Sequence, residues 1–290
     1  MTHATETNRR GTVHTFQTPG RTTLVVRAGS GRVAITAEDT DVTSVELTAL
    51  NSPGEEAVAQ ARVEQKRDSV VVDVPRHRAG LFRQGPAVAV VISCPTGTHL
   101  EVKADASDVR ATGTFGDSVL ITGSGDIDVE TVDGTAKVKS GSGTVSVGQV
   151  EQSLLVTTGS GDVSVHQSGS VARLTGGSGN ISLGEVVGEV VTRTGSGDVE
   201  VGRLDGSLMT KAGSGSLTVR RASTGTVRAN GASGDISIGV EQGTAAWLDL
   251  STVSGRVEQE LGASEAPDPG QPTVEIAAHT VSGSLRVHRS

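Results

Sequence analysis

Aromatic residues are almost absent from this chain. Its 290 residues include three Phe, one Trp and no Tyr, so aromatic residues make up 1% of the sequence. The interior must therefore be filled by Val, Ile, Leu and Ala, which suits a narrow, repetitive core better than a broad globular one. The chain also lacks a cluster of rings on which a sugar could stack, and this counts against an enzyme that acts on polysaccharides.

Cysteine and long apolar runs are equally scarce. Cys94 is the only cysteine, which excludes an intramolecular disulfide and fits a reducing cytoplasm. We expect its thiol to be buried and inert. The longest apolar run, AVAVVI at residues 87–92, is far shorter than a membrane span, and residues 1–17 lack the apolar segment of a signal peptide. The sequence therefore predicts a cytoplasmic protein with no membrane span.

Basic residues are fewer than acidic residues. The chain carries 25 Lys and Arg against 33 Asp and Glu, a formal net charge of -8. A general nucleic-acid binder needs a basic surface that displaces counterions from phosphates. We therefore expect no nucleic acid among the partners.

The residue constellations of catalysis are missing as well. Seven histidines are scattered along the chain, without the spacing of a metal site and without a neighbouring nucleophile. The Gly-Ser-Gly phrases lack the Lys and the helix that follow a phosphate-binding loop. The sequence therefore predicts no enzyme, no catalytic residue, no cofactor and no metal.

What the chain has in abundance is glycine, in a phrase that repeats. TGSGDIDV at residues 122–129 returns as SGSGTVSV, TGSGDVSV, GGSGNISL, TGSGDVEV and AGSGSLTV. The serines of these phrases lie at positions 124, 142, 160, 178, 196 and 214, so each is 18 residues from the next. The series continues with larger intervals at Ser233, Ser254 and Ser282. A fixed period of this size indicates a repeat architecture.

Apolar and polar residues alternate on both sides of each Gly-Ser-Gly corner, which is the two-residue period of strands. One apolar column after the corner reads Ile127, Val145, Val163, Ile181, Val199 and Leu217. Two short strands cannot bury an apolar face alone, whereas coils stacked at the ~4.8 Å spacing between strands share one continuous core. The sequence therefore predicts an all-β fold, a parallel β-solenoid (β-helix) with about 18 residues per coil, which we expect to be right-handed.

The corners carry a ladder of glycine and small polar residues. We expect the glycines to adopt backbone angles closed to other residues, and the residue after each corner to form a hydrogen bond within the turn. Acid occupies this position only in alternate coils, which separates the stacked carboxylates and is the opposite of what a calcium column needs. The predicted structural turn ladder comprises Gly125, Asp126, Gly143, Gly161, Asp162, Gly179, Asn180, Gly197, Asp198, Gly215, Gly234 and Asp235.

The two ends of the chain differ from the repeats. Residues 1–104 contain strand-like segments and PGEEAVAQARVEQ at 53–65, which begins like a short helix. We interpret them as an irregular, β-rich N-terminal cap. Residues 105–290 form the predicted solenoid, with a Pro-rich loop at 263–272 and a capping coil after it. We expect Trp247 to plug the core near this end.

The charges are arranged in a way that suggests a partner surface. Basic residues precede the corners and acidic residues follow them, so stacked coils would carry a basic stripe beside an acidic one. A separate basic loop, PRHRAGLFRQG at 75–85, contains two apolar residues suited to docking. The candidate residues for this surface are Lys137, Lys139, Arg173, Arg193, Lys211, Arg76, Arg78 and Phe82.

These features together resemble a widespread bacterial family of unknown function, whose members are built from β-strand repeats and are often labelled as adhesins. The resemblance rests on LVVRAGSGRVAITAEDTDVTSVEL, on the GSGD coils, and on the endings GTAAWLDLSTVSGRVEQEL and VEIAAHTVSGSLRVHRS. It implies a β-solenoid and carries over no catalytic residue.

We therefore predict a non-enzymatic scaffold or protein-binding module, with an unknown protein partner or with self-association. Three alternatives remain. They are a self-assembling, cytoskeleton-like filament, an adhesin-like surface protein, and a polysaccharide-acting β-helical enzyme.

Overall fold

The computed structural model describes residues 4–8, 11–76, 85–262 and 270–290. These residues form a large, mostly parallel sheet and one short helix, which confirms the all-β class. No helix in these ranges is long and apolar enough to cross a membrane. The chain divides into two compact units, residues 1–150 and residues 151–290. The division predicted between residues 104 and 105 falls inside one strand, β8 (His99–Phe115), and stays a prediction.

The first unit combines antiparallel and parallel pairing. β1 pairs with β2, β2 with β4, β4 with β7 and β5 with β6, all antiparallel. The long strand β3 pairs parallel with β6, β7 and β8, and the parallel pairing then continues through β9 to β11 and through β10 to β12. The elements are β1 (Ala4–Asn8), β2 (Gly11–Gln17), β3 (Thr23–Glu38), β4 (Val42–Ala49), α1 (Ser52–Gln60), β5 (Arg62–Lys66), β6 (Ser69–Asp73), β7 (Ala87–Pro95), β8, β9 (Ser118–Thr122), β10 (Ile127–Val132), β11 (Thr135–Ser140) and β12 (Val145–Val150).

Helix α1 is fixed to the sheet at its N-terminus. Asn51 caps the helix, because its Oδ1 accepts hydrogen bonds from the N–H of Gly54 at 2.8 Å and of Ala87 in β7 at 3.0 Å. Ala57 is buried and secures the apolar face of the helix. The short helix expected in PGEEAVAQARVEQ is therefore confirmed, although it ends at Gln60 and the rest of that segment enters β5.

The second unit is built from parallel pairings. The strands β16, β17 and β18 are 16 or 17 residues long and join segments that the sequence predicted as separate short strands. The elements are β13 (Ser153–Thr158), β14 (Val163–Ser168), β15 (Val171–Gly176), β16 (Ile181–Ser196), β17 (Val199–Ser214), β18 (Leu217–Ser233), β19 (Ile236–Val240), β20 (Ala245–Ser254), β21 (Val257–Gln259), β22 (Thr273–Ser282) and β23 (Leu285–Arg289).

The pairing register places equivalent residues of neighbouring repeats side by side. Ile127 lies opposite Val145 in the first unit. Ile181 lies opposite Val199, and Val199 opposite Leu217, in the second. All five side chains are buried, so the core consists of aliphatic columns that run from strand to strand. Each column gains its burial from the next repeat, as expected for an apolar face that one repeat cannot cover alone.

The corner glycines are needed mainly because neighbouring repeats approach closely. A Cβ atom on Gly179 would lie 2.2 Å from the carbonyl oxygen of Gly161, although the φ of Gly179 is not positive. Gly197 and Gly215 have φ values of 152° and 139° and meet the same close approach. The expectation of special backbone angles therefore holds at Gly197 and Gly215 and is wrong at Gly179, where the carbonyl of the preceding repeat leaves no room for a side chain.

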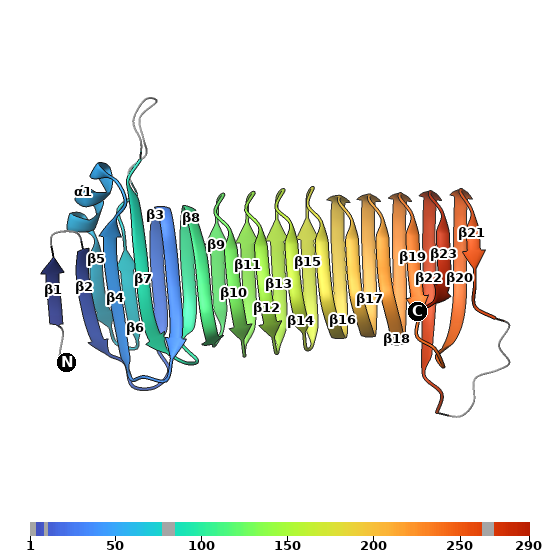
Figure 1. Cartoon of the computed structure of the whole chain (residues 1–290), viewed down its shortest axis with the longest axis horizontal. Coiled ribbons are helices and arrows are strands. Elements are labelled where there is room, and N and C mark those ends of the chain that lie inside the picture. Colours follow the sequence, from blue (N-terminus) through green and yellow to red (C-terminus); the bar gives the residue numbers. More distant parts are fainter. Residues whose placement is uncertain (1–3, 9–10, 77–84, 263–269) are drawn as a thin grey trace. The chain divides into compact units, whose positions relative to one another are not determined.

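The last repeat in the sequence is not the last repeat in space. β22 pairs with β18 on one side and with β20 on the other, and β23 pairs in the same way with β19 and β21. Figure 1 shows this order, with β20 and β21 beyond β22 and β23. The predicted capping coil after the Pro-rich loop therefore lies within the sheet. The terminal position belongs to residues 245–259.

Candidate functional site

Trp247 lies on the surface of the second unit and is 64% exposed. On β20 it alternates with Leu248 and Leu250, which face the core side, so Trp247 and Asp249 face outward. The expectation that Trp247 plugs the core is therefore wrong. The alternation of Trp, Leu, Asp and Leu in the sequence is the signal that could have placed the ring outside.

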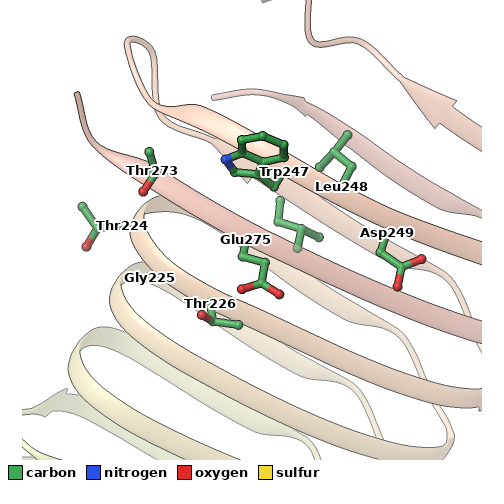
Figure 2. A pocket seen from close by; sticks show the side chains of 9 residues that line it. Thr224, Gly225, Thr226, Trp247, Leu248, Asp249, Thr273 and Glu275 are labelled. Atoms are coloured by element: carbon green, nitrogen blue, oxygen red, sulfur yellow. The ribbon is translucent and has the colours of Figure 1, made fainter. Parts of the chain in front are cut away.

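Trp247 borders a groove of about 810 Å³ on the outer face of this unit. It lies opposite Glu275 of β22, and Glu275 lies opposite Thr226 of β18. Asp249 and Thr273 also line the groove. Figure 2 shows the indole ring and the two carboxylates projecting from neighbouring strands. The groove thus combines one aromatic ring with acidic and hydroxyl groups, and Leu248 and Ile276 add aliphatic surface to its lining.

The two carboxylates of the groove have distant partners. Oε1 of Glu275 lies 3.9 Å from Nη2 of Arg228, and Oδ2 of Asp249 lies 3.7 Å from Nε2 of His279. The side chains of Glu275 and Asp249 are 58% and 76% exposed. Exposed ion pairs of this length contribute little free energy. Both carboxylates can therefore turn toward a ligand at low cost.

The residues of the turn ladder bond from one repeat to the next, not within their own turn. Oδ1 of Asp126 accepts a hydrogen bond from the N–H of Thr144 at 2.8 Å. Oδ1 of Asn180 accepts from the N–H of Asp198 at 3.0 Å, and Oδ1 of Asp198 accepts from the N–H of Ser216 at 2.8 Å. Because an amide oxygen serves as well as a carboxylate here, the ladder needs an acceptor and not a charge.

The turn ladder does not bring metal-ligating side chains together. In residues 4–8, 11–76, 85–262 and 270–290, no three His, Cys, Asp or Glu side chains are grouped so that they could hold a metal ion. Asp126, Asp162, Asp198 and Asp235 each accept a hydrogen bond from a backbone N–H of the neighbouring repeat.

The basic candidates do not form one unbroken stripe in the second unit. Lys211 lies opposite Arg193, so these two positive charges are neighbours, whereas Arg173 lies opposite Val191. Like charges that face each other across a strand pair are mildly destabilising. The exposed basic candidates on the strands are Lys137 and Lys139 of β11, Arg173 of β15, Arg193 of β16 and Lys211 of β17.

The basic loop at 75–85 is described only in part. Nη1 of Arg76 lies 3.3 Å from Oδ1 of Asp105. Arg78 and Phe82 lie outside the described residues. The docking role predicted for this loop stays a prediction.

Cys94 lies in β7 and is fully buried. Desolvation by burial raises the pKa of its thiol from 9.0 to about 11, and a hydrogen bond with Thr98 opposes this shift. The thiol therefore keeps its proton at neutral pH and is not a nucleophile, as the sequence predicted.

The fold and the groove define an all-β repeat protein with an exposed aromatic site. The chain belongs to the Toastrack DUF4097 family, whose model matches residues 15–174 and 168–288. This confirms the resemblance to a repeat family of unknown function that the sequence suggested. No curated protein matches the chain.

Several solved structures are similar to the chain. A candidate adhesin from Bacteroides fragilis has 14% identity and a TM-score of 0.42, over 96% of this chain and 98% of the other. A candidate lipid-binding protein from Parabacteroides distasonis has 13% identity and a TM-score of 0.43, over 97% of both chains. A candidate adhesin from Parabacteroides merdae has 12% identity and a TM-score of 0.41, over 97% of both chains.

Proposed function

We propose that the chain is a non-enzymatic binding module, built as a right-handed parallel β-solenoid with about 18 residues per coil. The observation that carries this proposal is the exposure of its only tryptophan in the groove at Trp247. Tryptophan buries more apolar area than other side chains and is the residue most enriched among binding hot spots. In a chain this poor in aromatics, placing the ring on the surface forgoes core stability and favours recognition.

The backbone around the groove supports binding with little loss of entropy. Its residues come from β18, β20 and β22, and each of these strands is held in register along most of its length. A surface that is already ordered does not need to be immobilised when a partner docks. Strand positions therefore suit a preformed recognition site better than a mobile loop would.

The chemistry of the groove favours a basic ligand. A cation over the face of an indole gains electrostatic energy from the ring, and the carboxylates of Asp249 and Glu275 add Coulombic attraction on the same outer face. The net charge of -8 attracts cations over a longer range. We propose that the groove binds a basic segment of a partner protein.

The fluorescence of Trp247 tests this proposal directly, because the chain has no other Trp and no Tyr. The full chain is titrated with octa-arginine, with octa-glutamate and with maltohexaose. We expect octa-arginine alone to shift the emission of Trp247, and salt to weaken the effect. Glu275→Gln should weaken binding of octa-arginine, whereas Glu189→Gln, at an exposed position on β16 outside the groove, should not.

Two results would contradict this assignment. If maltohexaose shifts the emission and octa-arginine does not, the groove is a site for carbohydrate and the basic ligand is wrong. If all three probes leave Trp247 unchanged, the groove is not the binding surface.

A further inference from the structure

Strand β20 presents an unpaired backbone edge. Among the described residues it pairs only with β22, and the N–H of Ala245 donates to the carbonyl oxygen of Pro272 on that side at 2.9 Å. Backbone groups alternate between the two sides of a strand. The N–H and C=O groups of Ala246, Leu248 and Leu250 therefore point to the open side.

The apolar core is also uncovered at this edge. Leu248 and Leu250 face the core side beside the buried residues Ile276 and Ala278 of β22, yet both stay partly exposed. On β21, Val257 is 47% exposed, although Leu285 opposite it is buried. The terminal repeat therefore exposes the apolar cross-section that every inner repeat covers with its neighbour.

The edges of the first unit are protected, which makes the edge of β20 distinctive. β1 and β5 are each five residues long, and Arg62, Glu64 and Lys66 alternate along β5 as exposed charges. Short and charged edges are the usual devices against unwanted pairing. β20 has ten residues and carries neither Lys, Arg nor Pro. Its one charged residue is Asp249, and a long exposed edge without Lys, Arg or Pro can accept a further strand.

We propose that two copies of this chain pair through β20 and β21, antiparallel and about a two-fold axis that passes Leu250 and Val257. This goes beyond the proposed binding function and does not depend on it. In the part of the chain that the structure describes, the terminal repeat has no neighbouring repeat to cover its open side. A partner that covers it needs two strands as far apart as β20 and β21, with apolar side chains between them. The same end of a second copy supplies both.

The position of the axis follows from the corner geometry. In earlier repeats the threonine before the corner accepts a hydrogen bond from the N–H of the glycine three residues later. Thr252 and Gly255 occupy these positions in the terminal repeat. Leu250 and Val257, each two residues farther from the corner, therefore face each other across the end of the core. A two-fold axis that passes Leu250 therefore also passes Val257.

The backbone groups agree with this axis. Leu250 directs its N–H and C=O to the open side, as shown above. The C=O of Arg256 accepts from the N–H of Leu285 at 2.8 Å, so the groups of its neighbour Val257 also point to the open side. An antiparallel pair centred on such residues exchanges two hydrogen bonds between them. Both strands can thus pair with their copies at the same time.

The side chains agree as well. Pairing about Leu250 sets Trp247 beside the partner's Val253, and these residues are 64% and 83% exposed in the single chain. Pairing about Val257 sets Arg256 opposite the partner's Glu258, twice by symmetry. Exposed apolar groups thus meet each other, and opposite charges meet across the strand pair.

A closed dimer is expected in preference to a filament. When two identical edges pair about a two-fold axis, both are covered and neither can bind a third copy. A filament needs a second, different edge that stays open. Among the described residues, the edge strands of the first unit, β1 and β5, are each five residues long and β5 carries exposed charges, so they do not offer one. The dimer extends the sheet beside the groove and leaves the ring of Trp247 between Glu275 and the partner's Val253.

Sedimentation of the full chain, and of variants in which the charges at Arg256 and Glu258 are exchanged, tests the pairing. We expect a species of twice 29.4 kDa that dissociates on dilution. Arg256→Glu sets a negative charge against the partner's Glu258 and should weaken the dimer by about tenfold or more. Glu258→Arg should weaken it similarly, and the double variant with both changes should restore it. Both residues are exposed, so neither change threatens the fold.

A disulfide at the axis provides a second test. The Cα atoms of a hydrogen-bonded antiparallel pair lie about 5.5 Å apart, within the range of a disulfide. Val257→Cys should therefore give a covalent dimer on oxidation, whereas Val187→Cys, at an equally exposed valine of β16, should not. The native Cys94 is buried and does not interfere.

Three outcomes would overturn the pairing. They are a monomer at every concentration up to the near-millimolar range, a dimer that the double charge exchange fails to restore, and an open-ended polymer. The dimer is judged by sedimentation of the variants at Arg256 and Glu258, and groove binding by the effect of Glu275→Gln on the octa-arginine titration, so failure of the dimer and failure of the binding function can be told apart.

Discussion

The stacking of the repeats predicts that Gly179→Ala is strongly destabilising. The added Cβ would lie 2.2 Å from the carbonyl oxygen of Gly161, about 1 Å inside an ordinary van der Waals contact. The two repeats would have to separate at this corner. Two hydrogen bonds that join them there, from Gly177 to Thr158 at 3.2 Å and from Ser178 to Gly159 at 3.1 Å, would be lost or stretched. At about 1 kcal/mol for each bond and 1–3 kcal/mol for the overpacking, the cost is about 2–4 kcal/mol.

Gly176→Ala is the matched control, three residues away in the same corner. The nearest atom to its added Cβ is Cγ2 of Thr158 at 3.6 Å, an ordinary contact, and the φ of Gly176 is not positive. This change should be neutral or stabilise by up to about 1 kcal/mol, because it restricts the unfolded chain. Urea unfolding followed by far-ultraviolet circular dichroism measures both variants, and hydrogen exchange localises the effect. Equal midpoints for the two variants would refute close stacking as the reason for the corner glycines.

Two further predictions concern buried side chains. Oγ1 of Thr194 is buried with no hydrogen-bond partner in the described part of the chain, so Thr194→Val should raise the free energy of unfolding by about 1 kcal/mol. Thr158→Val loses the hydrogen bonds to Gly161 and should lower it by about 1–2 kcal/mol. Urea unfolding measures both changes. The raised pKa of Cys94, about 11 against 9.0, means that the folded state keeps its proton after the unfolded chain has lost it. Stability is therefore fully present below pH 9 and falls by about 2–3 kcal/mol as the pH rises toward 11, and Cys94→Ala should remove this part of the pH dependence; identical pH profiles for the two proteins would contradict it.

The sequence predicts the core of this fold well, because burial follows the repeat. Residues 18 apart, such as Ile181 and Val199, share a chemical type and turn out to be neighbours in the parallel sheet. The helix at Ser52–Gln60 also follows from local signals, an Asn cap and a proline in the first turn. In the first case the information recurs at a fixed interval, and in the second case one short stretch contains it.

The order of the final repeats cannot be predicted in this way. β22 lies between β18 and β20, although β20 precedes it in the chain. Both segments carry the same pattern, TVSG after alternating apolar residues, so either could pair with β18. Periodicity identifies what can stack and leaves the stacking order open, because the order depends on packing between segments that are distant in sequence.

The candidate site is hard to predict for a related reason. Residue type favours the core for Trp247, although its alternation with Leu248 and Leu250 places it outside. Glu275 joins it through the pairing of β20 with β22, two strands separated by the Pro-rich loop, so no local pattern could link the two residues. The position of β22 between β18 and β20 makes β20 the terminal strand and leaves its edge open. The order of the two strands therefore decides both features, because reversing it would set Trp247 instead of Glu275 beside Thr226 and would make β22 the edge strand.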